Sequence, residues 1–312
     1  MTKRDYLSGL ELSAGETLDL IERALIQKRE TEAGKRHTSL AGKNFALLFE
    51  KSSTRTRVSF QVGVAQLGGT SIFLSPNDTQ ISRGETIADT ARVLSEYLDG
   101  LIVRTFGHDR VAGLAENASI PVINGLTDLH HPCQALADFL TLRERFGTIR
   151  GLKVAYLGDG NNVLHSLLLV GALIGVNTSA ACAPGFEPDE GVVSKARELA
   201  AASGASVHIT SEVEEACADA HTVYTDVWVS MGQENEANRR KKALAPYRVT
   251  GEVFRNADPE AVFMHCLPAH RGEEVESDII DGARSLVFQQ AGNRLHALKI
   301  LLEILVGDNN GA

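Results

Sequence analysis

Short apolar runs alternate with amphipathic stretches along most of the chain, and this rhythm limits the folds that it can adopt. From Asn44 onward, each apolar run of strand length is followed by a helix-like segment. Such a rhythm indicates strand and helix units joined into a mostly parallel sheet. The predicted strands lie near 45–49, 70–74, 101–104 and 121–123, and near 153–157, 178–181, 206–209, 222–224 and 262–266. The sequence therefore predicts an α/β protein with two doubly wound domains, each with a mostly parallel central sheet.

Two helices are predicted where the halves join and where the chain ends. Pro132 suits the first turn of a connecting helix because its missing N–H is not needed there, and Gly147 suits the end of that helix. A last helix is predicted over roughly 290–306, with leucines along one stripe. Periodicity alone does not say which half this last helix packs on.

The chain is acidic, with a formal net charge of -9 over 312 residues. This balance argues against a general nucleic-acid or anionic membrane surface, so a bound anion needs a local cluster of cations. No apolar core segment indicates a secretory signal or an anchor within Met1–Ser13, and the apolar stretch Leu167–Val176 is too short to span a bilayer. The four cysteines lack paired spacing, so a reducing cytoplasm is predicted.

The segment Lys51-Ser52-Ser53-Thr54-Arg55-Thr56-Arg57 combines hydroxyl groups and cations at a predicted helix start. Backbone N–H groups are unpaired there, the helix dipole is positive, and Arg55 can hold two oxygens of one anion. The alternative is a Ser/Thr cap beside solvated arginines. The segment is therefore a candidate phosphate site, with Ser53, Thr54 and Thr56 as further donors.

Arg104 and the segment His131-Pro132-Cys133-Gln134 add candidates at other strand ends. Arg104 follows an apolar run, and His131 lies at the start of the connecting helix. Both fall at the carboxyl-end crevice where open α/β sheets bind ligands. Taken alone, each has a structural explanation, as an ion-pair residue or a helix-start histidine. Together with the phosphate segment they favour an anion site.

Two common phosphate motifs are missing. No stretch matches the P-loop pattern, which argues against a standard nucleoside triphosphatase. Gly158-Asp159-Gly160 follows a predicted strand, but Val163 stands where a dinucleotide fingerprint has its third glycine. No acidic residue ends the next predicted strand. We therefore expect no nicotinamide or flavin cofactor, and no other cofactor is indicated.

Four segments together resemble the aspartate/ornithine carbamoyltransferase family. They are Ser53-Thr54-Arg55-Thr56-Arg57, Val103-Arg104-Thr105, His131-Pro132-Cys133-Gln134 and His265-Cys266-Leu267-Pro268. One five-residue match would be weak, whereas the full set in the family's order and approximate spacing is very specific. The resemblance covers nearly the whole chain and implies an enzyme that transfers a carbamoyl group from carbamoyl phosphate to an amine.

The resemblance also implies a set of carbamoyl phosphate ligands. They are Ser53, Thr54, Arg55, Thr56, Arg104, His131, Gln134, Cys266, Leu267 and Arg294, with Gln80 contributed by a neighbouring subunit. A closed trimer, or a multiple of it, is therefore implied. The implied domains are 1–147 for carbamoyl phosphate, with the C-terminal helix 290–312 packing back onto it, and 148–289 for the second substrate.

The run Asp226-Val227-Trp228-Val229-Ser230-Met231-Gly232 looks like the ornithine branch of the family. The resemblance assigns ornithine binding to Asn162, Asp226, Ser230 and Met231. For Trp228 we expect core packing instead. Asp226 lies just beyond a predicted buried strand, where a carboxylate needs a cationic partner, and the ornithine α-ammonium would supply one.

The segment from His265 to Gly272 completes the implied site, with Cys266 and Leu267 touching the substrates. Catalytic roles are implied for Arg104, His131, Asp226 and Cys266. A cysteine at the end of an apolar strand is more often an inert buried residue than a reactive thiol, and nothing in the sequence demands a covalent enzyme intermediate. We expect no metal at His265 and His270, because their spacing is not that of helical ligands.

Arg294, in Asn293-Arg294-Leu295-His296, maps to a family residue at the bound carbamoyl group. The chain departs from the family at Gly292, where a glutamate is common, and this puts local helix stability and the aim of Arg294 in doubt.

The expected acceptor is the δ-amine of ornithine, which would give citrulline. The rivals are carbamoyltransferases for aspartate, putrescine or acylated ornithine, and a catalytically silent carbamoyl-phosphate-binding protein. Putrescine has no α-carboxylate or α-ammonium for Asn162 and Asp226 to recognise. The sequence does not separate arginine synthesis from arginine breakdown, because both directions use the same site.

Overall fold

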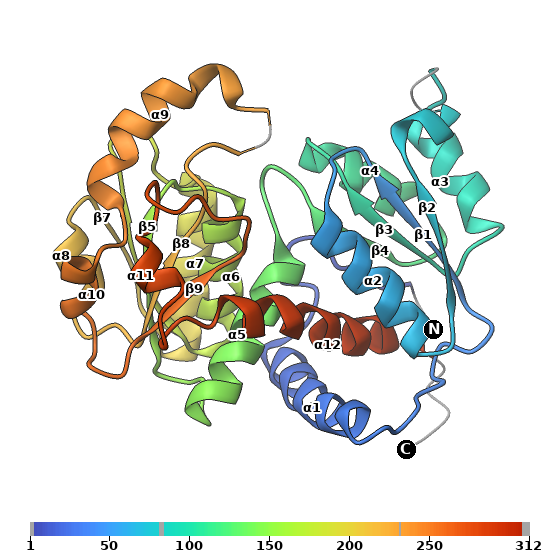
Figure 1. Cartoon of the computed structure of the whole chain (residues 1–312). Coiled ribbons are helices and arrows are strands. Elements are labelled where there is room, and N and C mark those ends of the chain that lie inside the picture. Colours follow the sequence, from blue (N-terminus) through green and yellow to red (C-terminus); the bar gives the residue numbers. More distant parts are fainter. Residues whose placement is uncertain (1–2, 81–83, 231, 308–312) are drawn as a thin grey trace. The chain divides into compact units, whose positions relative to one another are not determined.

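The structure is a computed structural model that describes residues 3–80, 84–230 and 232–307 (Figure 1). The chain divides into two compact units, unit 1 (Met1–Leu140 and Arg294–Ala312) and unit 2 (Thr141–Asn293). Both divisions fall inside helices, namely α5 (Pro132–Phe146) and α12 (Val287–Val306). The predicted boundaries, 147/148 and 289/290, lie near helix ends instead, because a sequence pattern marks where a helix stops and not where its contacts change.

Unit 1 contains a four-stranded sheet in the order β2-β1-β3-β4, and every strand pair in it is parallel. Its strands are β1 (Asn44–Phe49), β2 (Thr70–Leu74), β3 (Gly100–Arg104) and β4 (Val122–Leu126). Its other elements are α1 (Ala14–Glu32), α2 (Thr54–Gln66), η1 (Pro76–Asp78), α3 (Ile87–Ser95), α4 (His108–Asn117) and parts of α5 and α12.

The strand order of unit 1 changes direction at β1, since the chain passes from β1 to β2 on one side and later to β3 on the other. The carboxyl ends of strands at such a switch point form the usual ligand crevice of an open α/β sheet. Ser53 follows β1, and Arg104 ends β3 in register with Phe49. The topology therefore brings two predicted anion-binding positions to one point of the sheet.

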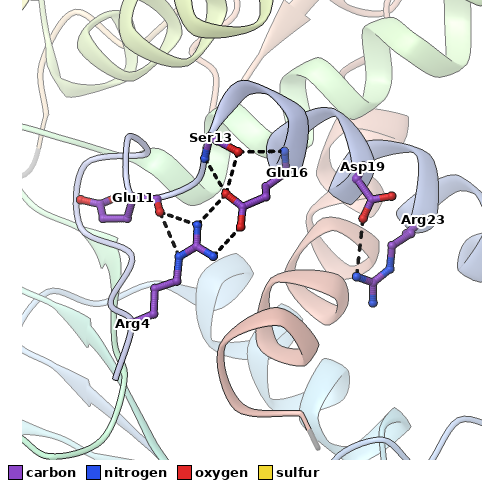
Figure 2. Close-up of polar contacts among 6 residues, drawn as sticks. All are labelled: Arg4, Glu11, Ser13, Glu16, Asp19 and Arg23. Carbon is purple, nitrogen blue, oxygen red and sulfur yellow. Dashed lines mark hydrogen bonds and ion pairs between the residues drawn. The ribbon is translucent and has the colours of Figure 1, made fainter. Parts of the chain in front are cut away.

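Helix α1 was not among the predicted elements. Figure 2 shows its start, where the Ser13 side chain accepts the N–H of Glu16 and the Glu16 carboxylate accepts the N–H of Ser13. The Arg4 guanidinium forms a bidentate contact with the same carboxylate, with Nη1 2.6 Å from Oε1 and Nη2 2.8 Å from Oε2. Glu16 therefore satisfies both a helix cap and a guanidinium, and these bonds lower its pKa to about 2.

Unit 2 contains a five-stranded sheet in the order β7-β6-β5-β8-β9, again with parallel pairs throughout. Its strands are β5 (Lys153–Gly158), β6 (Asn177–Cys182), β7 (Val207–Thr210), β8 (Thr222–Thr225) and β9 (Val262–His265). Its helices are α6 (Asn162–Ile174), α7 (Glu190–Ser203), α8 (Val213–Cys217), η3 (Glu234–Glu236), α9 (Ala237–Leu244), η4 (Ala245–Tyr247), α10 (Gly251–Arg255) and α11 (Ser277–Ile280). The predicted fold class, two α/β units with parallel sheets, is confirmed.

The switch point of unit 2 lies between β5 and β8, which pair in parallel. Asn161 and Asn162 follow β5, Asp226 follows β8, and Cys266 follows β9. Three predicted substrate positions of this unit therefore lie past the carboxyl ends of adjacent strands. Trp228 is 3% exposed and belongs to the apolar core of the unit, as predicted.

The last helix, α12, begins at Val287, three residues before the predicted start near Gln290, and continues through Gly292. A Cβ added at Gly292 would meet no atom within 4 Å among the described residues, so close packing does not require a glycine at this position. In unit 1, the buried Lys299 of α12 donates a hydrogen bond from Nζ to the Thr31 hydroxyl oxygen of α1. No helix within the described ranges is both long enough and apolar enough to cross a membrane.

Candidate active site

The loop after β1 forms a capped helix start in unit 1. The Ser53 Oγ accepts the N–H of Thr56 at 3.2 Å, which makes Ser53 the N-cap of α2. Thr54 and Arg55 occupy the first turn, where backbone N–H groups have no helical acceptor. No acidic side chain lies in this turn, so the positive end of the helix keeps its affinity for an anion.

His131 is the point on which the cations of unit 1 converge. It is 4% exposed and directly precedes α5. Burial lowers the pKa of His131 well below 6.5, and the positive charges of Arg294, Arg104 and Arg55 lower it further. Arg294 lies in α12, Arg104 ends β3 and Arg55 lies in the first turn of α2. The predicted residues Arg55, Arg104 and Arg294 therefore act on His131 as one cationic cluster, and their charges favour its neutral form, which can still donate one N–H.

Thr56 is tied into this cluster. Arg294 Nη2 donates to Thr56 Oγ1 at 2.6 Å, and both side chains are buried. Because a guanidinium only donates, the hydroxyl oxygen is the acceptor and its own O–H stays available as a donor. Thr56 is therefore oriented by Arg294 to donate a hydrogen bond to a bound oxygen.

Gln134, in the first turn of α5, is 1% exposed, and its Nε2 donates to Asp138 Oδ1 at 2.8 Å. The carboxylate accepts only, so the amide must present its NH₂ to Asp138 and its carbonyl oxygen away from it. Among the described residues that carbonyl oxygen has no hydrogen-bond donor. A buried amide oxygen of this kind can accept the NH₂ of a carbamoyl group.

Asp226 anchors the site in unit 2. Its Oδ2 accepts from Asn161 Nδ2 at 2.8 Å, and its Oδ1 lies 2.9 Å from Cys266 Sγ. Tyr156 is buried, which raises its pKa well above 10, and its hydroxyl donates to Asn161 Oδ1 at 3.2 Å. The described residues contain no lysine or arginine paired with Asp226. The expected cationic partner of this carboxylate is thus not supplied by the described chain itself.

Cys266 faces Asp226 as a thiol. At 2.9 Å from a carboxylate oxygen, the sulfur must supply the hydrogen, since a thiolate would be repelled by the carboxylate. Cys266 therefore helps to fix the Asp226 carboxylate.

Leu267 holds its backbone in an uncommon conformation beside Cys266. Its φ is +57°, in the left-handed region, and its N–H donates to His265 Nδ1 at 2.8 Å. A branched side chain disfavours that region, so the surrounding bonds must maintain it. The peptide bond between Leu267 and Pro268 is cis.

The remaining predicted residues are less tightly placed. Asn162 is half-buried in the first turn of α6, and Ser230 is half-buried with its N–H donating to Gln233 Oε1 at 3.0 Å. Met231 lies outside the described residues. Gln80 is exposed after η1, and none of its hydrogen bonds among the described residues reaches the His131 cluster. The described chain therefore does not bring Gln80 to that cluster.

Comparison with known proteins identifies the family. The carbamoyl-P binding domain of aspartate/ornithine carbamoyltransferases matches residues 4–144, and their Asp/Orn binding domain matches residues 150–305. The chain belongs to the aspartate/ornithine carbamoyltransferase family.

Relatives within this family are similar over nearly their whole length. The ornithine carbamoyltransferase of Anoxybacillus flavithermus is 54% identical over 303 residues, which cover 97% of this chain and 96% of that protein. The anabolic ornithine carbamoyltransferase of Pyrococcus furiosus is 50% identical over 304 residues, covering 97% and 96%. The solved structure of ornithine carbamoyltransferase from Pyrococcus furiosus has a TM-score of 0.95 at 49% identity, covering 98% of this chain and 97% of that chain.

Several residues that support this carbamoyltransferase site were not predicted from the sequence. Asn161 caps α6 through Oδ1 and holds Asp226, and its position before an apolar helix is the signal that a cap prediction would have used. In unit 1, buried Lys51 forms an ion pair with Asp128. In unit 2, buried Arg240 forms an ion pair with Asp159. These two ion pairs join residues far apart in the sequence, so no local pattern announces them.

Two groups in the described part of this carbamoyltransferase have the spacing of metal ligands. They are Asp226 with His265 and Cys266, and His270 with Glu273 and Glu274, each with ligand atoms within 4.8 Å of one another. In the first group the thiol hydrogen already serves Asp226, and in the second Lys241 Nζ lies 2.5 Å from Glu273. In each group, one of the possible ligand atoms therefore already has a protein partner.

We expect His131 to stay neutral when ordinary histidines become protonated. Its folded pKa is below 6.5, so as the pH falls through 6.5 the unfolded chain gains a proton that the folded chain does not. The native state therefore loses stability over that range from this group. Nitrogen NMR of the histidines, assigned with His131→Gln, should show that His131 is still neutral at a pH at which exposed histidines are protonated. Titration of His131 near pH 6.5 would contradict the cluster described above.

Proposed function

We propose that this chain is an ornithine carbamoyltransferase, which transfers the carbamoyl group of carbamoyl phosphate to the δ-amine of L-ornithine and releases L-citrulline and phosphate. The observation that carries the proposal is the cluster of unit 1, where burial and the charges of Arg294, Arg104 and Arg55 lower the pKa of His131, and where α2 begins with an uncompensated positive end. Such a cluster suits a small dianion that also carries a polarisable carbonyl group.

Each group of the cluster has a proposed task in the reaction. Ser53, Thr54 and Arg55 bind the phosphate at the N-terminus of α2. Arg104, His131 and Thr56 donate to the carbonyl oxygen, and Gln134 accepts from the carbamoyl NH₂. These donors are fixed before the reaction by burial and by their protein partners, so little reorganisation is needed as charge develops.

The chemical step follows from these contacts. The neutral δ-amine of ornithine attacks the carbonyl carbon, a C–N bond forms, and negative charge grows on the carbonyl oxygen. The bond from that carbon to the bridging oxygen then breaks, and phosphate leaves with the bonding electrons. The amine gives up one proton during this step, and the Asp226 carboxylate is its proposed acceptor. Arg104 and His131 stabilise the oxyanion, while Arg55 and the α2 terminus stabilise the leaving phosphate.

Ornithine recognition is proposed for unit 2. Asp226 is held by Asn161 and Cys266 with no cation among its described partners, so the α-ammonium of ornithine is the charge that would complement it. Asn162 would bind the α-carboxylate, and Ser230 and Met231 would complete the contacts. Asp226 and Cys266 are also proposed to help the δ-amine lose its proton.

A closed trimer is proposed as the working assembly, with Gln80 serving the carbamoyl phosphate site of a neighbouring subunit. Exposed apolar side chains on unit 1 support an assembly, because Val58 and Val62 of α2 and Ile72 of the edge strand β2 are 51%, 39% and 57% exposed. Gln80 itself is exposed and so is accessible to a second copy. We further propose a role in arginine biosynthesis in the cytoplasm, supported by the relative from Pyrococcus furiosus that is named anabolic.

A substrate panel tests the proposed function. The purified protein receives carbamoyl phosphate with ornithine, putrescine, N-acetylornithine or aspartate, and both the ureido product and phosphate are measured. We expect citrulline from ornithine, with kcat/KM on the order of 10²–10⁴-fold above that for the other amines, because unpaired buried groups penalise the wrong substrate. Faster turnover of another amine, or no turnover with any of them, would overturn the proposal.

A further inference from the structure

Glu274 is a carboxylate with no exposed surface, and nothing proposed so far gives it a task. It lies in unit 2 beside His265, which is also completely buried, with Glu274 Oε1 3.3 Å from His265 Nε2. A buried carboxylate is costly unless its partners are fixed. Glu274 therefore requires an explanation in terms of what it holds.

The tautomer of His265 follows from its other nitrogen. Leu267 N–H donates to Nδ1 at 2.8 Å, so Nδ1 must be unprotonated and the ring proton must be on Nε2. That Nε2–H lies beside Glu274, whose Oε1 is 3.3 Å from Nε2 without the geometry of a hydrogen bond, and a carboxylate there can only accept. A carboxylate at this position thus favours the one neutral tautomer that can accept from Leu267.

Both ends of this arrangement are held in place. Glu274 Oε1 accepts the N–H of His270 at 2.6 Å, which fixes the carboxylate. The N–H of His265 donates to Gln290 Oε1 at 3.0 Å, and Gln290 Nε2 donates to the Tyr224 hydroxyl at 3.0 Å. The backbone of His265 is therefore held from β8 and α12, and the Glu274 carboxylate is held by its own loop.

The segment that His265 controls is the one proposed to touch the substrates. Leu267 keeps a φ of +57° against the preference of its side chain, and its N–H bond to His265 holds that conformation. The adjacent Cys266 places its sulfur 2.9 Å from Asp226 Oδ1. Any rotation of the Leu267 amide would move both the thiol and the backbone beside it.

We propose that Glu274 is a positioning residue that keeps His265 in its Nε2–H form, so that bare Nδ1 holds Leu267 and aims Cys266 at Asp226. The assignment deepens, and in its kinetic part rests on, the proposed carbamoyl transfer to ornithine. Glu274 does not touch substrate. It acts on the reaction only through His265 and the backbone of the 266–267 segment.

The tautomer can be tested without any activity. Nitrogen NMR of histidine-labelled protein, with His265→Gln to assign the signal, should show His265 as a neutral ring protonated on Nε2. A ring protonated on Nδ1, or on both nitrogens at neutral pH, overturns the proposal whether or not the protein is a carbamoyltransferase.

Two substitutions at Glu274 separate its acceptor from its charge. Glu274→Gln keeps an oxygen that can accept from His265 Nε2 and from His270 N–H, so kcat/KM for ornithine should stay within about tenfold of the unsubstituted protein. Glu274→Ala removes the acceptor, and kcat/KM should fall about 100-fold, because small misplacements of reacting groups cost that much. The affinity for inorganic phosphate, proposed to rest on Ser53, Thr54 and Arg55, should not change in either variant.

Glu273→Gln is the matched control, since Glu273 is the neighbouring carboxylate and its side chain pairs with the exposed Lys241. It should leave the kinetics and the His265 signal unchanged. If Glu274→Ala does not fold, Glu274→Gln and the tautomer of the unsubstituted protein still decide the matter. If Glu274→Ala and Glu274→Gln have the same kcat/KM, whether both are normal or both are impaired, the positioning role is overturned. Absence of citrulline formation in the unsubstituted protein would instead count against the proposed function.

Discussion

Replacing Arg104 with alanine should lower kcat for citrulline formation by about 10²–10³-fold, which corresponds to about 3–4 kcal/mol of transition-state stabilisation. Arg104 is 6% exposed at the end of β3, and its positive charge helps to lower the pKa of the buried His131 imidazole. A guanidinium held there meets the oxyanion without rearranging. Its loss cannot be made good by water, because the position is enclosed.

The measurement is the rate of the first turnover, followed by rapid quench with saturating carbamoyl phosphate and ornithine, so that product release does not hide the chemical step. Arg110→Ala is the matched control, because Arg110 also lies near the carboxyl end of the sheet of unit 1 but pairs with Glu50 at 2.5 Å. Near-normal chemistry in a correctly folded Arg104→Ala protein would show that the oxyanion is stabilised by other groups.

Replacing Arg240 with alanine should reduce the free energy of unfolding by about 3–5 kcal/mol, the usual effect of removing one partner of a buried ion pair. Arg240 pairs with Asp159, and its Nε donates to the Trp228 carbonyl at 2.6 Å. Burial already raises the pKa of Asp159 to about 6 even beside this guanidinium. Without Arg240, the carboxylate is left uncompensated in the same apolar surroundings.

The pH dependence of this variant has a definite sign. A carboxyl pKa raised by burial means that the folded chain binds a proton more readily than the unfolded chain, so the penalty is present at neutral pH and is relieved as the pH falls. Removal of Arg240 raises the pKa of Asp159 further, so Arg240→Ala should recover stability relative to the unsubstituted protein as the pH falls toward about 6. Urea unfolding at fixed protein concentration measures this, and Arg239→Ala, at an exposed neighbour, is the control. A pH-independent loss would mean that packing, and not the charge of Asp159, is responsible.

The periodicity of the sequence was sufficient to predict the strands of both sheets, and it was insufficient to predict the first helix, α1. All nine strands lie within about three residues of their predicted positions, because buried parallel strands are short apolar runs bounded by turn residues. Helix α1 was not predicted, since its charged residues hide the apolar positions Leu20, Ile21 and Ala24. The capping pattern of Ser13 and Glu16 was its one clear local signal.

The candidate site divides in the same way. Arg104 and the Ser53–Thr56 segment could be placed together from the sequence, because parallel strands put their carboxyl ends at one edge. The partners of Asp226 could not, because Asn161 and Cys266 reach it from other strands of the sheet. Glu274 was equally hidden, since its burial against His265 arises from tertiary contacts that no spacing reveals.

A crystal structure of the protein with phosphonoacetamide, a stable analogue of carbamoyl phosphate, tests the central claim most directly. The account predicts that the phosphonate lies on the backbone N–H groups of Thr54 and Arg55, with the analogue's carbonyl oxygen within hydrogen-bond reach of Arg104, His131 and Thr56. An analogue bound away from the start of α2, or one whose carbonyl group points away from Arg104 and His131, would contradict it.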